Sequence, residues 1–284
     1  MPPKSISLLQ INSAVLLWAG TAMFAKGIPL SVFHITGMRY LIASAALLLF
    51  MRVFKRPVLL KNRGECIAMV VLGLLLCGNG LTLFQSLKVS SAAVALLALY
   101  TYPTFTALLE PLVFKEKFKL VNLASAAIAF VGLLVMMPKF DLTHDTTKGV
   151  LLGVLAGIFQ MLRSLMIRKH VRTLSSSTVI FWQMLVTGLI MTPWLLLQPA
   201  TYNPSAWGLL ILLGIVFTAA PQTLYAASLK GLSVRTVGII ATMQPLLAAG
   251  LGYLIYQEKI DGRTLIGGAL ILSCFAFEVL KKDA

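Results

Sequence analysis

The chain repeats itself at a fixed offset. When the sequence is shifted by 142 residues, half of its 284-residue length, a stretch of the first half aligns with the second half without a gap. The matched positions are Leu87-Lys88 with Leu229-Lys230, Pro103 with Pro245, and Glu116-Lys117 with Glu258-Lys259. Each copy holds an apolar run broken by one proline, then a Glu-Lys pair and a second apolar run. Such self-similarity predicts one structural unit used twice.

The composition places this repeat in a membrane. Hydrophobic residues make up 58% of the chain and charged residues 12%, whereas a soluble domain has about 25% charged residues. A helix needs about 20 apolar residues to cross a bilayer. The sequence predicts ten such helices, at 8–27, 31–51, 66–87, 91–114, 120–137, 149–167, 175–197, 206–228, 232–256 and 262–280. A soluble protein would need polar faces, which segments 68–76 and 209–220 lack.

The first apolar segment has the basic start of a secretory signal, so cleavage is the alternative to a membrane span. Two features favour the span. Trp18 interrupts what would be the apolar core of a signal, and the segment has a counterpart in the second half, with Ala14 matching Ala156. Its loss would leave five helices facing four. We therefore expect it to be the first transmembrane helix.

The net charge of +15 is distributed by side of the membrane. With the N-terminus inside, sixteen Lys and Arg residues fall in cytoplasmic segments and six in external ones, while Arg39 and Arg163 lie within spans. This bias is typical of the positive-inside rule and predicts that both termini are cytoplasmic. The basic excess is thus an orientation signal, and we expect no nucleic-acid partner. The three cysteines, Cys66, Cys77 and Cys274, lack metal-type spacing and are predicted to be buried.

Five helices per copy make the two copies point in opposite directions. The predicted units are residues 1–142 and 143–284, joined within one integral membrane protein. An inverted repeat has a pseudo-twofold axis in the membrane plane, and its natural binding site lies near the midplane between the halves. The longest loops have about a dozen residues, so they leave no room for a soluble catalytic domain.

Three motifs strengthen this interpretation. The run VLLWAG occupies residues 15–20, Arg39 is followed by Tyr40 in the second helix, and each half has a proline thirteen residues before Glu-Lys. With the five-plus-five arrangement, these features resemble the EamA-type transporters of the drug/metabolite transporter superfamily. The resemblance covers essentially the whole chain. It implies a small-molecule carrier, commonly an exporter of amino acids, metabolites or drugs, with a central cavity, in the bacterial inner membrane.

Polar residues recur near the midpoints of the predicted spans. Amide and phenol groups are costly in hydrocarbon unless they are paired, so several at one depth indicate a shared wet cavity. The alternative is that each one hydrogen-bonds a neighbouring helix. The predicted substrate-binding set is Trp18, Asn79, Tyr100, Tyr102, Gln160, Gln222, Tyr225 and Gln244, together with Arg163.

Prolines predict where the helices loosen. Pro103, Pro221 and Pro245 each lack an N–H and clash with the preceding turn, which frees a carbonyl. Gly78-Asn79-Gly80 is expected to weaken the third helix at the level of Pro221, since Asn79 and Pro221 are 142 residues apart. These sites are either passive kinks or hinges that shape the binding site.

Three charged residues lie well inside the predicted spans, away from their ends. Arg163 shares a helix face with Gln160, so it either clamps an anionic substrate or extends to the inner headgroups, about five residues away. The resemblance assigns Arg39 a fold or gating role. Glu110 lies on the face of Pro103, where a carboxylate either couples transport to protons or pairs with a nearby base such as Lys115.

The sequence lacks the motifs of the competing functions. We find no metal-binding or nucleophile motif of an enzyme, no charge ring or filter of a channel, and no ATP-binding loop. It therefore predicts a secondary transporter of a small amphipathic metabolite, without cofactor or metal. A lipid flippase on the same ten helices and an accessory subunit are the alternatives. Expected partners are the substrate and membrane lipids, and small residues in 262–268 leave a homodimer contact open.

Overall fold

The computed structural model of the chain is all-helical in the part it describes. That part comprises residues 4–102, 104–106, 109, 120–137, 141, 143–171, 173–198, 204–232, 237 and 240–280. The first half contains α1 (Lys4–Gly27), α2 (Val32–Val53), α3 (Arg63–Val89), α4 (Ala92–Leu99) and α6 (Leu120–Met136). The second half contains α7 (Asp145–His170), α8 (Ser176–Leu197), α9 (Pro204–Gly214), the π-helix η1 (Ile215–Ala219), α10 (Ala220–Ser228), α12 (Met243–Tyr256) and α13 (Gly262–Leu280).

Six segments within these residues are long and apolar enough to cross a membrane. They are Lys4–Phe24, Val32–Val53, Arg63–Val89, Asp145–Ile167, Ser176–Leu197 and Pro204–Ser228. Shorter apolar helices cover Ala92–Thr106, Ala127–Met136 and Gly262–Ser273. Each of the ten predicted stretches contains described helix. The count of ten spans and their orientation remain predictions.

Serine and asparagine residues fix where several helices begin. The Ser91 hydroxyl accepts a hydrogen bond from the Val94 amide at 3.2 Å, and the Asn62 side chain accepts one from the Glu65 amide at 2.9 Å. Such caps satisfy N–H groups that a helix start leaves without a partner. Short loops with capping residues therefore turn the chain directly from one helix into the next.

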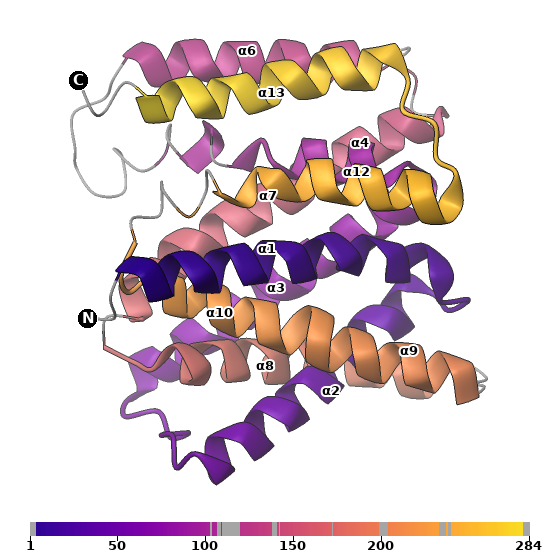
Figure 1. Cartoon of the computed structure of the whole chain (residues 1–284). Coiled ribbons are helices and arrows are strands. Elements are labelled where there is room, and N and C mark those ends of the chain that lie inside the picture. Colours follow the sequence, from indigo (N-terminus) through magenta and orange to yellow (C-terminus); the bar gives the residue numbers. More distant parts are fainter. Residues whose placement is uncertain are drawn as a thin grey trace.

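The helices lie roughly side by side, and those of one half are interleaved with those of the other (Figure 1). Several of the largest contacts have a counterpart at the repeat offset. The packing of α3 on α7 matches that of α10 on α1, and the packing of α3 on α8 matches that of α9 and η1 on α2. The pairs α2 with α8 and α6 with α13 are their own counterparts. The start of α1 and the end of α13 lie at the same end of the molecule (Figure 1).

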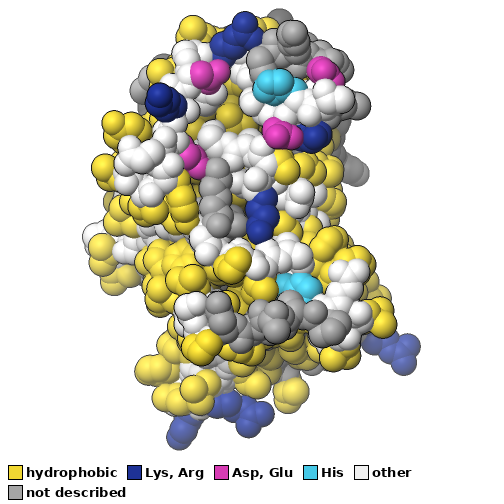
Figure 2. Space-filling model, turned by 90° about the vertical axis from the view of Figure 1, so that its right-hand side faces the viewer, with side chains coloured by type: hydrophobic (Ala, Val, Ile, Leu, Met, Phe, Trp, Pro, Cys, Tyr) yellow, Lys and Arg dark blue, Asp and Glu magenta, His cyan; other side chains and the backbone are white. Residues whose placement is uncertain are grey.

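The end of the molecule opposite the start of α1 carries most of the described Asp and Glu residues. Figure 2 looks onto the end where α1 and α12 finish, and Asp and Glu side chains gather on its upper half. They come from the segment that leads into α7 and from the connection between α12 and α13, and include Asp145, Glu258 and Asp261. This is the end that the charge distribution predicts to be external.

Large apolar side chains cover the outside of the bundle. Leu74, Phe130 and Leu196 are all exposed, and Leu196 keeps 76% of its surface accessible. Apolar exposure of this extent has no explanation in water, whereas lipid tails would cover it. Cys66 is also exposed, so its predicted burial is wrong: it lies in the first turns of α3, where the helix face is not covered by a neighbour. Cys77 is buried as predicted.

Small residues bring α6 and α13 together. A Cβ atom at Gly267 would clash with the Gly132 carbonyl oxygen, so glycine at this position allows the two backbones to touch. The glycine face that left a dimer contact open is therefore used, at Gly267, for packing within one chain.

The helices are interrupted at equivalent places in the two halves. α4 ends at Leu99, a turn follows at Tyr100, and Thr242 precedes α12 at the position 142 residues later. Pro245 lies in the first turn of α12, where a helix needs no donor. Pro103 lies outside the described residues. By contrast, α3 runs unbroken through Gly78-Asn79-Gly80, because Asn79, unlike Pro221, keeps its backbone N–H.

Candidate functional site

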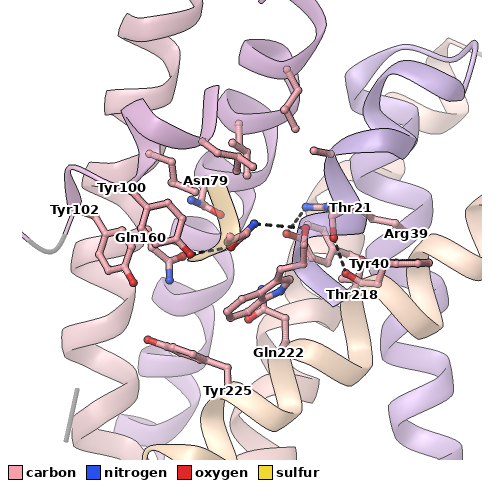
Figure 3. A pocket seen from close by; sticks show the side chains of 18 residues that line it. Thr21, Arg39, Tyr40, Asn79, Tyr100, Tyr102, Gln160, Thr218, Gln222 and Tyr225 are labelled. Carbon is pink, nitrogen blue, oxygen red and sulfur yellow. Dashed lines mark hydrogen bonds between the residues drawn. The ribbon is translucent and has the colours of Figure 1, made fainter. Parts of the chain in front are cut away.

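One cavity lies where the two halves meet (Figure 3). All eight uncharged residues of the predicted binding set line it: Trp18, Asn79, Tyr100, Tyr102, Gln160, Gln222, Tyr225 and Gln244. Arg39 lines it as well, with Thr21, Tyr40, Phe217, Thr218 and several aliphatic side chains. None of these lining residues is Asp or Glu. The cavity is therefore aromatic and amide-rich, and its charged lining group is a cation.

The two helix interruptions meet at the cavity wall. The Tyr100 hydroxyl donates to Gln244 Oε1 at 2.8 Å, and Gln244 Nε2 lies 3.4 Å from the Trp18 carbonyl oxygen. The Trp18 and Tyr225 rings lie 5.3 Å apart, and those of Tyr100 and Tyr102 lie 5.7 Å apart. Residues from both halves thus form one continuous wall of rings and amides.

Pro221 explains a second link between the halves. A proline at this position removes the i→i−4 donor to the Phe217 carbonyl, and η1 occupies Ile215–Ala219 immediately before it. The Thr21 hydroxyl of α1 donates to that carbonyl at 3.0 Å. At the equivalent level of the first half, Asn79 Nδ2 donates to the Ala156 carbonyl of α7 at 2.9 Å. Both donors belong to the first half, and each ties its helix to a backbone carbonyl of the second half.

Arg163 lies behind the cavity wall. It is 1% exposed, and its guanidinium donates from three nitrogens to three glutamine amide oxygens. Nε donates to Gln183 at 2.9 Å, Nη1 to Gln160 at 2.8 Å, and Nη2 to Gln222. The side chain neither extends to the headgroups nor lines the cavity. Instead it holds two lining amides, those of Gln160 and Gln222.

Arg39 lies on the cavity wall and is also buried. Its guanidinium carbon lies 4.3 Å from the centre of the Tyr40 ring and 4.1 Å from that of Phe84. Nη2 donates to the Tyr40 hydroxyl at 2.5 Å. A Cβ at Gly80 would lie 3.2 Å from this nitrogen, so glycine gives the guanidinium its room. Within the described part of the chain, Nε has no hydrogen-bond partner.

The sequence did not predict several residues of the site. Gln183 completes the shell around Arg163, and Thr21, Tyr40 and Thr218 line the cavity. Thr21 carried a signal, because it is the repeat counterpart of Arg163. Glu110 lies outside the described residues, so its predicted role stays a prediction. No group of three or more His, Cys, Asp or Glu that could hold a metal occurs among the residues that the structure describes.

Comparison with known proteins agrees with this architecture. The profile of the EamA-like transporter family matches residues 5–137 and again residues 147–277. An uncharacterized transporter of Archaeoglobus fulgidus is 26% identical over 93% of this chain and 92% of its own. The S-adenosylmethionine uptake transporter of Rickettsia prowazekii is 23% identical over 96% and 89%. The pseudopaline exporter CntI of Pseudomonas aeruginosa is 25% identical over 63% of each chain.

A solved crystal structure shows the same fold. It superposes with a TM-score of 0.73 at 22% identity, over 98% of both chains. The double match of the family profile accounts for both copies of the repeat, and the described helices supply the membrane-spanning segments that a transporter needs. The chain belongs to the EamA-like transporter family.

Proposed function

We propose that the chain is a secondary carrier of a small amphipathic metabolite, an organic anion or an amino-acid-like zwitterion. It exports or exchanges this cargo across the bacterial inner membrane. The observation that carries the proposal is the cavity between the halves, which is lined by aromatic rings, amides and the buried Arg39. The rings suit an apolar body, and the donors suit an anionic head.

The mechanism that follows is alternating access. Ten spans with both termini inside form two inverted units, 1–142 and 143–284, that rock about the cavity. Equivalent helix breaks at Tyr100 and Thr242 support this arrangement, since each gives its half a matching point of bending. Energy comes from a gradient or from exchange.

Contacts at the predicted external end support the rocking motion. Glu258 accepts a hydrogen bond from the Ala92 amide at 3.0 Å, at the start of α4. The Tyr256 hydroxyl donates to the Met23 carbonyl of α1 at 2.8 Å. Both bonds join the end of α12 to helices of the other half, so outward opening requires them to break. The helix dipole stabilises a carboxylate at a helix N-terminus by about 0.3–1 kcal/mol. An interaction of this size can break during each transport cycle.

Two relatives differ in the direction that their names state, one an uptake transporter and one an exporter. They support a carrier rather than a channel or an enzyme, and direction therefore has to be measured.

The test is reconstitution of the full chain in liposomes, with labelled amino acids and organic acids, with and without a pH gradient. We expect saturable movement of at least one carboxylate, and a marked loss in Gln244→Leu. The control is Thr82→Val, because Thr82 bonds the Gly78 carbonyl of its own helix at 2.7 Å and does not line the cavity. Movement of no amino acid or organic acid in either direction would overturn the proposal.

A further inference from the structure

The guanidinium of Arg39 has donors that the protein leaves unused. An arginine carries five N–H donors, and in the described residues its one hydrogen-bond acceptor is the Tyr40 hydroxyl. Its Nε has no hydrogen-bond partner among the described residues. The residue is buried, with 5% of its surface exposed, and it lines the cavity. A buried cation without an anionic partner is costly. The site is therefore poised for an anion that arrives from the cavity.

Thr218 supplies a second unused group on the same wall. Its hydroxyl oxygen is buried and has no partner within the described part of the chain, and Thr218 lines the cavity beside Arg39 (Figure 3). It lies in the π-helix η1, which packs against α2, the helix that carries Arg39. Single π-turns occur frequently at functional sites. A cation and a hydroxyl donor from different halves thus border one part of the cavity.

Arg163 cannot serve the same purpose. All three of its nitrogens already donate to glutamine oxygens, and it does not line the cavity. Its effect on a ligand is indirect. Because the oxygens of Gln160 and Gln222 accept from Arg163, each amide has its NH₂ group left to donate, and one N–H of Gln160 already points to the Ser164 hydroxyl at 3.4 Å. Arg163 therefore makes this part of the wall a donor surface.

We infer that Arg39 and Thr218 form the subsite that binds the carboxylate of the cargo, and that Arg163 is a positioning residue for the amides beside it. The apolar body of the cargo then lies against Trp18 and Tyr225, which both line the cavity and whose ring centres lie 5.3 Å apart. This inference rests on the proposed function and gives the cargo an orientation in the cavity.

The test compares two probes of the same shape that differ only in the head group, the carboxylate of phenylacetate and the neutral amide of phenylacetamide. Their binding to the purified full chain is followed by unfolding temperature and tryptophan emission. The wild type is expected to prefer the carboxylate, and Arg39→Gln to lose about 10- to 100-fold in carboxylate affinity, the scale of a charged hydrogen-bond pair. Amide affinity should stay within about threefold. Thr218→Val should lose less carboxylate affinity than Arg39→Gln, and Thr82→Val should lose none.

Each outcome separates the subsite from the carrier function. Equal losses for both probes in Arg39→Gln, or an unchanged preference, would overturn the subsite while leaving carboxylate transport by the wild type intact. Failure of the wild type to move any carboxylate in liposomes would overturn the carrier function itself. If Arg39→Gln does not fold, Arg39→Lys keeps the charge but not the planar fork. An intermediate preference in that variant supports the subsite, and an unchanged one contradicts it.

Discussion

Two buried arginines lie on opposite sides of the cavity wall, and their surroundings differ. Arg163 is 1% exposed and donates to Gln160, Gln183 and Gln222. Arg39 is 5% exposed, packs between two rings and has the Tyr40 hydroxyl as its acceptor in the described residues. The chain thus bonds all three nitrogens of one guanidinium to neutral dipoles, and gives the other, which lines the cavity, a single hydrogen bond within the described residues.

This difference separates stability from binding. Three amide dipoles stabilise a cation without neutralising it, so Arg163 adds positive charge near the cavity while joining α7, α8 and α10. Arg39 bonds only to Tyr40 of its own helix within the described residues, and its other N–H groups can donate to a ligand. We therefore expect Arg163 to matter most for folding, and Arg39 for recognition.

The sharpest way to break this comparison is to remove each cation in turn. Arg163→Met leaves three buried amide oxygens without their donor, and should lower the free energy of unfolding by about 3–5 kcal/mol, since each buried acceptor left unpaired costs about 1–3 kcal/mol. Arg39→Met removes one hydrogen bond together with a buried unpaired charge, so its loss should be about 1 kcal/mol or less. Thermal and denaturant unfolding in detergent measure both. Equal losses would mean that the two arginines have the same structural role.

A smaller change tests the shell around Arg163 alone. Gln183→Leu removes the acceptor of Nε but no lining residue, and should cost about 1–3 kcal/mol, the penalty for one buried donor left unpaired. Carboxylate preference should be unchanged, because Gln160 and Gln222 keep their bonds to Arg163. A variant of normal stability that has lost the preference would show that Gln183 acts on the cargo rather than on the shell.

Much of the fold was predictable because a bilayer imposes the length and polarity of each helix. The apolar run at 175–197, for example, corresponds to α8 at Ser176–Leu197. The run at 206–228 was predicted as one helix, yet it contains η1. Pro221 indicates a lost hydrogen bond in this span. The proline alone does not decide between a kink and a π-turn, because the outcome depends on which group donates to the freed carbonyl. Here the donor is the hydroxyl of Thr21, from the other half.

The lining of the cavity was predictable for a related reason. A polar side chain at mid-span must face protein or water, so residues at one depth, such as Asn79, Gln160 and Gln244, converge. The position of Arg163 was not predictable. Both interpretations assumed that its charge reaches an anion or a lipid headgroup. Its partner Gln183 lies on α8, and the sequence pattern does not determine which face of that helix is turned toward Arg163. A single sequence supplies depth, but it does not supply pairing between helices.

The smallest test concerns Thr21, the repeat counterpart of Arg163. Thr21→Val keeps the shape but removes the bond to the Phe217 carbonyl, and should cost about 0.6–1 kcal/mol, typical of one hydrogen bond between membrane helices. Thr82→Val is the matched control, because the Gly78 carbonyl that it bonds lies within the same continuous helix. If the two variants unfold at the same temperature, the Thr21 bond contributes nothing to joining the halves. A measurable loss in Thr21→Val alone would show that the repeat has given one position two roles: in α1 a hydroxyl joins the two halves, whereas its counterpart Arg163 in α7 bonds three glutamines of its own half.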